Sequence, residues 1–146
     1  MFEKILFPTA GSALAEKIAE VIVKLIKEKP DRQVTILNVV QGYQVPGEVE
    51  FEMEAKGVHL DDFIQKNVEA SIGKAVEIFK NNGVPYTVEI KMGDPVKNIV
   101  ETAKNMECDL VVIGYHGETT LTDFIFKGNT MSRIIDECVS PVMVIK

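Results

Sequence analysis

Apolar residues along the chain form short continuous runs that alternate with stretches of period near 3.6. The runs at 4–8, 34–40, 110–113 and 141–146 predict strands, and an alternating run at 85–91 predicts a less buried one. Periodic stretches from Leu14, Asp61, Pro95 and Gly128 predict amphipathic helices. The apolar stripe of the last one comprises Met131, Ile134, Ile135 and Cys138. The four consecutive apolar residues of 110–113 are typical of a central parallel strand covered on both faces.

Local signals mark where several of these helices begin and end. Ser12 is the predicted N-cap of the first helix, which must end before Pro30. Asparagine and glycine at 81–83 predict a stop for the second helix. Asp94 followed by Pro95 predicts a capped start with proline at the first helical position, where its missing N–H costs nothing.

The alternation of strands and helices predicts an α/β fold. We expect a single domain over 1–146: an open, five-stranded parallel sheet of order 3-2-1-4-5 with helices on both faces, of the flavodoxin-like or Rossmann-like kind. In such sheets ligands bind outside the carboxyl ends of the strands, where the winding direction reverses. The turns at 8–12 and 114–117 would flank that crevice.

Residues 41–60 interrupt this pattern and predict an extended loop or flap. Acidic and apolar residues alternate strictly from Glu48 to Ala55, between glycines at 47 and 57. Period two favours an edge strand or a flap, a loop with its charges outward is the simpler alternative, and Val49 and Met53, four apart, would also suit a helix. The sequence leaves these three possibilities open. His59 is expected to face solvent.

Composition narrows the range of partners. The chain has 146 residues, 46% of them hydrophobic, and a net charge of −6, with no basic cluster that would bind nucleic acid. We expect no membrane segment and no signal peptide, and therefore a cytoplasmic protein. Cys108 and Cys138 are too few and too far apart for a zinc site; buried hydrophobic side chains are the simpler reading, and a disulfide is the alternative.

Glycines after the fourth strand supply the main functional signal. Gly114 and Gly117 allow backbone N–H groups to turn toward a ligand, and Gly128, Asn129 and Thr130 open the last helix. A helix start offers unpaired N–H groups and partial positive charge to an anion. The sequence therefore predicts a phosphate-sized site here, in which His116 is a binding or loop-packing residue rather than a catalytic one.

The sequence lacks the motifs of several enzyme classes. Neither a P-loop nor a dinucleotide fingerprint is present. The first strand ends at Thr9 and Ala10 without the acidic cluster of a receiver domain. Residues 10–12 match only weakly the glycine-rich, serine-bearing turn of a PP-loop ATP pyrophosphatase. No set of residues supplies a nucleophile, a base and a metal for fast phosphoryl transfer. We therefore expect no enzyme, although slow ATP hydrolysis stays open.

The whole chain resembles the universal stress protein family. Its nucleotide-binding members carry Gly-x2-Gly-x9-Gly-[Ser/Thr] after the fourth strand, and residues 114–117 with 128–130 are similar. Residues 4–9, 37–39, 93–95, 109–114 and 141–145 also resemble the family's pattern. The resemblance implies a flavodoxin-like domain, usually a homodimer, that binds ATP or AMP, with or without Mg²⁺, or in a second subgroup no nucleotide.

The resemblance also implies roles for individual residues. Backbone groups of the three glycines would hold phosphates and ribose, Asn129 and Thr130 would contact phosphate, Val39 would meet adenine through its main chain, and Thr9 and Ala10 would line the adenosine pocket. The candidate site comprises Pro8, Thr9, Ala10, Val39, Ile113, Gly114, His116, Gly117, Gly128, Asn129 and Thr130.

Three departures from the family pattern keep a rival open. Ten residues rather than nine separate Gly117 from Gly128, Asn129 stands where Ser or Thr is expected, and Ala10 replaces an acid. The rival is a nucleotide-free dimeric interaction protein of the same fold. In both cases we expect a homodimer paired through the last strand, Val142–Ile145, since an apolar edge strand is an aggregation hazard unless another chain covers it.

Overall fold

The computed structural model describes residues 1–11, 13–40, 60–115 and 130–146. Five strands form one sheet of order β3-β2-β1-β4-β5, and every neighbouring pair is parallel. The predicted fold class and strand order are therefore confirmed. The elements are β1 (Lys4–Pro8), α1 (Leu14–Glu28), β2 (Gln33–Val40), α3 (Leu60–Asn81), β3 (Tyr86–Met92), α4 (Pro95–Asn105), β4 (Leu110–Gly114), α5 (Thr130–Glu137) and β5 (Val142–Ile145).

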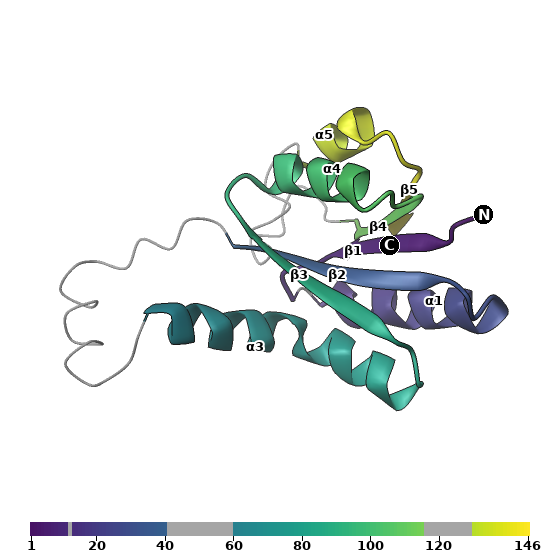
Figure 1. Cartoon of the computed structure of the whole chain (residues 1–146), viewed down its shortest axis with the longest axis horizontal. Coiled ribbons are helices and arrows are strands. Elements are labelled where there is room, and N and C mark those ends of the chain that lie inside the picture. The colour runs from purple at the N-terminus through teal and green to yellow at the C-terminus, as the bar shows by residue number, and fades with distance from the viewer. Residues whose placement is uncertain (12, 41–59, 116–129) are drawn as a thin grey trace.

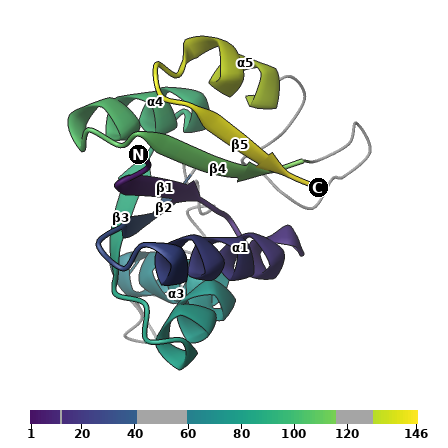
Figure 2. The same ribbon diagram turned by 90° about the vertical axis from the view of Figure 1, so that its right-hand side faces the viewer.

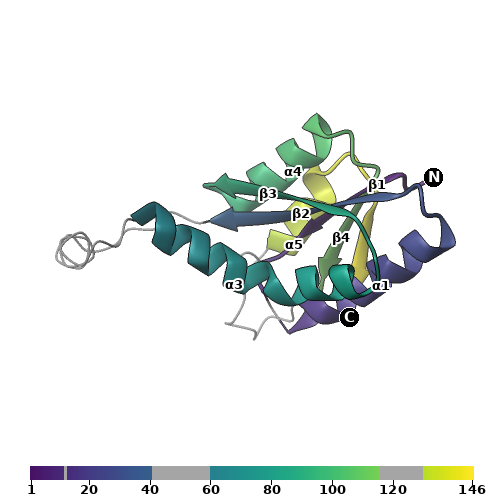
Figure 3. The same cartoon turned by 60° about the horizontal axis from the view of Figure 1, so that its bottom comes forward.

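Helices cover both faces of this sheet (Figures 1 and 2). α1 and α3 lie on one face, and α4 and α5 lie on the other. α3 runs along the side of β2 and β3, whereas α1 lies nearer β4 and β5 (Figure 3). Each face has its own apolar cluster, because successive side chains of a strand point to opposite faces. Ile5 and Phe7 pack under α1 and α3, and Leu6 packs under α4 and α5.

The strands differ in burial as the sequence predicts. All five residues of β4 are buried, which suits a strand with neighbours on both edges and helices on both faces. β3 lies at one edge of the sheet, and most of it is exposed. One local prediction is wrong. Ile135, assigned to the apolar stripe of the last helix, is 49% exposed, while Ile134 carries the packing of α5.

Helix starts follow the expected signals only in part. Asp94 caps α4 by accepting a hydrogen bond from the Lys97 N–H at 2.9 Å, as predicted. α1 has Ala13 at its N-cap, with no side-chain hydrogen bond there. The predicted cap Ser12 lies outside the described residues. So does the segment from Gln41 to His59, and the flap expected at 41–60 therefore stays a prediction. Only its last residue, Leu60, is described, and it belongs to α3.

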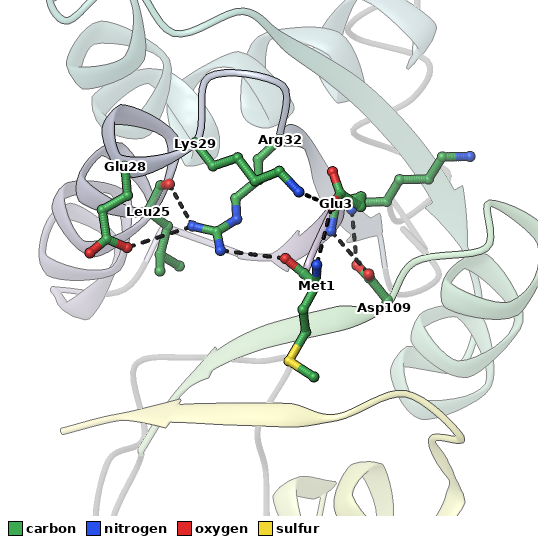
Figure 4. Close-up of polar contacts among 8 residues, drawn as sticks. Met1, Glu3, Leu25, Glu28, Lys29, Arg32 and Asp109 are labelled. Carbon is green, nitrogen blue, oxygen red and sulfur yellow. Dashed lines mark hydrogen bonds and ion pairs between the residues drawn. The ribbon is translucent and has the colours of Figure 1, made fainter.

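Polar contacts stabilise the amino edge of the sheet, the side at which its strands begin (Figure 4). The Asp109 carboxylate accepts from the backbone N–H groups of Glu3 at 3.0 Å and Lys4 at 2.9 Å. Arg32 donates to the carbonyl of Leu25 at 2.8 Å, and Lys29 pairs with Glu3. These contacts join the starts of β1 and β4 to the turn between α1 and β2.

The electrostatics of Asp109 depend on this geometry. Partial burial alone would raise its pKa, but the hydrogen bonds from the N–H groups of Lys4 and Glu3 outweigh burial and hold the pKa below its ordinary value. The ionised carboxylate therefore stabilises the fold above the pKa of an unfolded aspartate. That contribution is lost as the pH falls through the lowered pKa of the folded state.

Candidate functional site

The candidate site lies at the carboxyl edge of the sheet, at the end of β1. Pro8 is the last residue of β1, and Thr9 and Ala10 begin the turn toward α1. Thr9 is buried and donates its N–H to the carbonyl of Leu37 at 2.9 Å. Its hydroxyl oxygen accepts from the N–H of Gly11 at 3.2 Å. The turn is therefore held by bonds to β2 and by its own side chain.

Asn38 fixes the same turn from β2. Its side-chain amide is buried and donates from Nδ2 to the carbonyl of Thr9 at 3.0 Å. A buried carbonyl without a partner would cost about 1–3 kcal/mol, so this bond is a strong constraint on the path of the chain. The sequence shows Asn38 only as a lone polar residue near the end of an apolar strand. That signal was visible, but its role as an anchor was not predicted.

Gly11 holds the turn against α3. Its φ of +87° lies in the left-handed region, and a Cβ at this position would lie 2.6 Å from the carbonyl oxygen of Ser71. Only glycine meets both requirements. The turn from Thr9 to Gly11 therefore lies between Asn38 of β2 and Ser71 of α3, which leaves the intervening Ala10 at a defined place.

Main-chain groups of β2 and β4 point toward the end of β1 from its two sides. Successive residues of a strand direct their N–H and C=O groups to opposite neighbours. The Val40 carbonyl accepts from Gly93, beyond β3, so the N–H and C=O of Val39 face the β1 side. The Tyr115 N–H donates to Ile145 of β5, so the main-chain groups of Gly114 also face the β1 side.

The structure brings together six of the predicted site residues. Pro8, Thr9, Ala10, Val39, Ile113 and Gly114 lie at the ends of three adjacent strands. Of these, Ile113 is buried in the apolar cluster under α4 and α5, so its side chain belongs to the core. Thr130 is half-buried at the start of α5. The predicted residues His116, Gly117, Gly128 and Asn129 lie outside the described part of the chain.

Other chemistry is limited in the described ranges. These residues include no group of three His, Cys, Asp or Glu side chains that could hold a metal ion. None of the helices in them is long and apolar enough to cross a bilayer. Cys108 and Cys138 are both free and pack in one apolar cluster, so the disulfide alternative is not formed. Burial raises the pKa of both thiols, which keeps them protonated near neutral pH.

Comparison with known proteins gives a consistent result over the full length. The model of the universal stress protein family matches residues 1–146. The universal stress protein MJ0531 of Methanocaldococcus jannaschii is 28% identical over 146 residues, which cover 100% of this chain and 83% of the relative. The solved structure of the protein MJ0577 from the same organism shares 25% identity at a TM-score of 0.73, covering 100% of this chain and 96% of that one.

Two more distant structures share the fold at 16% identity. One is a universal stress protein in complex with cAMP, with a TM-score of 0.68 and coverage of 99% of this chain and 97% of that one. The other is the universal stress protein of Archaeoglobus fulgidus in complex with dAMP, with a TM-score of 0.69 and coverage of 100% and 98%. With the family match extending from the first residue to the last, this chain belongs to the universal stress protein family.

Proposed function

We propose that this chain is a regulatory module that binds an adenine nucleotide, ATP or AMP, at the carboxyl edge of its sheet. The observation that carries the proposal is the convergence of Val39 and Gly114 on the end of β1. A backbone N–H and C=O side by side form a donor and acceptor pair, which suits the donor and acceptor edge of adenine. Thr9 and Ala10 would then lie beside the nucleoside.

The ligands of related proteins support this choice. Two structures of the same fold were solved with cAMP and with dAMP, and both ligands are adenine nucleotides. The predicted phosphate-binding half, formed by Gly114, Gly117 and Gly128 with His116, Asn129 and Thr130, follows from the sequence pattern. We infer that the nucleotide binds with or without Mg²⁺. We propose that it acts as a regulatory signal in the cytoplasm and is not a substrate that the protein rapidly turns over.

A direct measurement tests the proposal. Acid denaturation of the purified protein, followed by chromatography and absorbance of the supernatant, should release adenine nucleotide, and calorimetric titration of the nucleotide-free protein should detect binding of ATP or AMP. A protein that releases no nucleotide and gives no heat with either ligand would instead be the nucleotide-free dimeric interaction protein, which the substitution at Ala10 and the longer gap before Gly128 favour.

Replacing Ala10 with aspartate should strengthen nucleotide binding. Alanine offers no side-chain acceptor to the nucleoside, whereas a carboxylate could accept a hydrogen bond from it. A hydrogen bond to a charged group contributes about 1.5–3 kcal/mol, or roughly a ten- to hundredfold gain in affinity. Calorimetric titration of ATP and AMP into both proteins measures the change. Ala10→Asn, which adds a neutral acceptor of similar size, is the control, and an unchanged affinity in Ala10→Asp would place the nucleoside away from Ala10.

We also propose a homodimer that pairs through β5, the edge strand of the sheet opposite β3. The carbonyl of Pro141 accepts from Val111 of β4, and that of Ile145 accepts from Tyr115, the residue after β4. By the alternation of main-chain groups, the N–H groups of Val142 and Val144 therefore face the open edge. A second copy of β5 would pair with them and would bury either Val142 and Val144 or Met143 and Ile145, all of which are half-buried in one chain.

Val144→Pro removes one of these outward donors while leaving the bonds to β4 in place. We expect the variant to sediment as a monomer or to aggregate, since proline both deletes the N–H and crowds an approaching strand. Val144→Ala keeps the donor and should remain dimeric. Sedimentation velocity at micromolar concentration distinguishes them, and a wild-type protein that sediments as a monomer would refute the dimer.

A further inference from the structure

The edge strand β3 carries an apolar stripe that the rest of the described chain leaves exposed. Val88, Ile90 and Met92 are 37%, 40% and 61% exposed. Because side chains alternate along a strand, these three lie on the same face as Tyr86, which packs against Phe79 of α3. The helix therefore contacts this face of β3 at the first residue of the strand, and the next three side chains of the face are open to solvent.

The main-chain groups of the same residues point away from the sheet. Gly93 donates its N–H to β2 at 3.1 Å. Because main-chain groups alternate in direction along a strand, those of Val88, Ile90 and Met92 face the open edge. The side-chain amide of Asn98 reaches the Met92 carbonyl from that side at 3.1 Å. Among the described residues, none bonds to the outward groups of Val88 and Ile90, so the edge can accept another strand.

The opposite face of β3 carries two charges in a fixed order. Glu89 and Lys91 lie on the same face as Thr87, whose hydroxyl is 2.7 Å from the hydroxyl of Thr35 in β2. Their charged groups are 3.9 Å apart and both side chains are partly exposed. Residues 88–92 therefore read apolar, acidic, apolar, basic, apolar. In the reverse direction the acid and the base exchange places, so the strand is complementary to an antiparallel copy of itself.

One antiparallel register uses this complementarity. A two-fold axis at Ile90 places Ile90 opposite its own copy, Val88 opposite Met92, and Glu89 opposite Lys91 on both sides of the axis. An axis at Glu89 or at Lys91 would instead set like charges directly opposite each other, which destabilises a sheet. An axis at Val88 would leave Met92 beyond the start of the other strand, since β3 begins at residue 86.

We propose that β3 is a self-association surface through which two copies of this chain pair antiparallel about Ile90. Residues with outward main-chain groups lie opposite one another in this register and exchange both N–H···O bonds. The Met92 carbonyl keeps its bond from Asn98, because a carbonyl oxygen has two lone pairs. The contact is distinct from pairing through β5 at the other edge of the sheet. It is carried by few side chains, as in small transient interfaces, and we expect a dissociation constant of about 0.1–1 mM.

Sedimentation equilibrium between about 10 μM and about 1 mM protein tests the surface. By mass action, the weight-average mass of wild type should rise by about half or more over this range. Lys91→Glu and Glu89→Lys each set like charges opposite each other across the axis, so each should remove most of the rise. The double variant with both substitutions restores the complementary order and should associate like wild type. An equimolar mixture of the two single variants should also associate, because each strand then faces its complement.

Lys24→Glu is the matched control. It changes the net charge as much as Lys91→Glu does, but at an exposed position of α1, and its mass should rise like that of wild type. Circular dichroism checks that each variant is folded.

Three results would overturn the proposal. A wild-type mass that stays constant up to about 1 mM would show that copies of this chain do not cover the stripe. Single variants that associate like wild type, or a double variant and a mixture that both fail to recover association, would show that Glu89 and Lys91 do not lie opposite each other. An equal loss in Lys24→Glu and Lys91→Glu would assign the effect to net charge.

Discussion

The Gly11→Ala variant should lose about 2–5 kcal/mol of its free energy of unfolding. An alanine at φ +87° costs about 1–2 kcal/mol, and its Cβ would lie 2.6 Å from the carbonyl oxygen of Ser71. That oxygen belongs to the backbone of α3, so α3 or the turn must shift, which adds about 1–3 kcal/mol. Urea denaturation followed by circular dichroism measures the loss. Nucleotide affinity should fall as well, because the turn carries Thr9 and Ala10.

Two other glycines provide matched controls for this effect. Gly83 has φ +66° and open space around its missing Cβ, so Gly83→Ala should cost only about 1 kcal/mol. Gly73 lies within α3 with nothing within 4 Å, so Gly73→Ala should stabilise the protein by up to about 1 kcal/mol. If Gly11→Ala were no more destabilising than Gly83→Ala, the contact with Ser71 would not constrain the turn.

Gly117→Val should abolish nucleotide binding. The sequence predicts that Gly117 lies in the phosphate loop, where glycine adopts positive φ and leaves room for the ligand. Valine disfavours positive φ because of its branched Cβ, and it would fill the space that the phosphates need. Isothermal titration with ATP and AMP is the measurement, with circular dichroism to confirm that the variant is folded.

Gly117→Ala separates the two reasons for this loss. Alanine tolerates positive φ better than valine and occupies less space, so it should retain weak binding. A folded Gly117→Val protein with wild-type affinity would show that the glycines serve only the turn and that the phosphates bind elsewhere. If adenosine alone still binds to Gly117→Val, the damage is confined to the phosphate half.

The sequence was sufficient to predict the sheet and its order, because its signals are local. Four consecutive apolar residues at 110–113 are typical of a strand covered on both faces. The pair Asp94 and Pro95 marks a helix start because an aspartate side chain can cap the helix and proline suits its first position. The order 3-2-1-4-5 was expected as part of this fold class, and the structure has that order.

The anchoring of the site could not be predicted in the same way. Asn38 and Thr9 are 29 residues apart, and nothing in their sequence context shows that the amide of one meets the carbonyl of the other. The contact of Gly11 with Ser71 likewise depends on how α3 packs. Ile135 was misassigned for a related reason: helical period places both Ile134 and Ile135 near one face, but the short α5 buries only the first.

The contacts of Asp109 and Arg32 have a consequence for how this chain can diverge. They fasten the amino edge of the sheet, whereas the candidate site occupies the opposite edge. Substitutions at Ala10 or Thr130 therefore leave these contacts unchanged. A lineage can exchange one ligand preference for another, or lose its ligand, through changes at the carboxyl edge while the framework stays folded. Ala10, which stands where the family pattern has an acid, is a position of this kind.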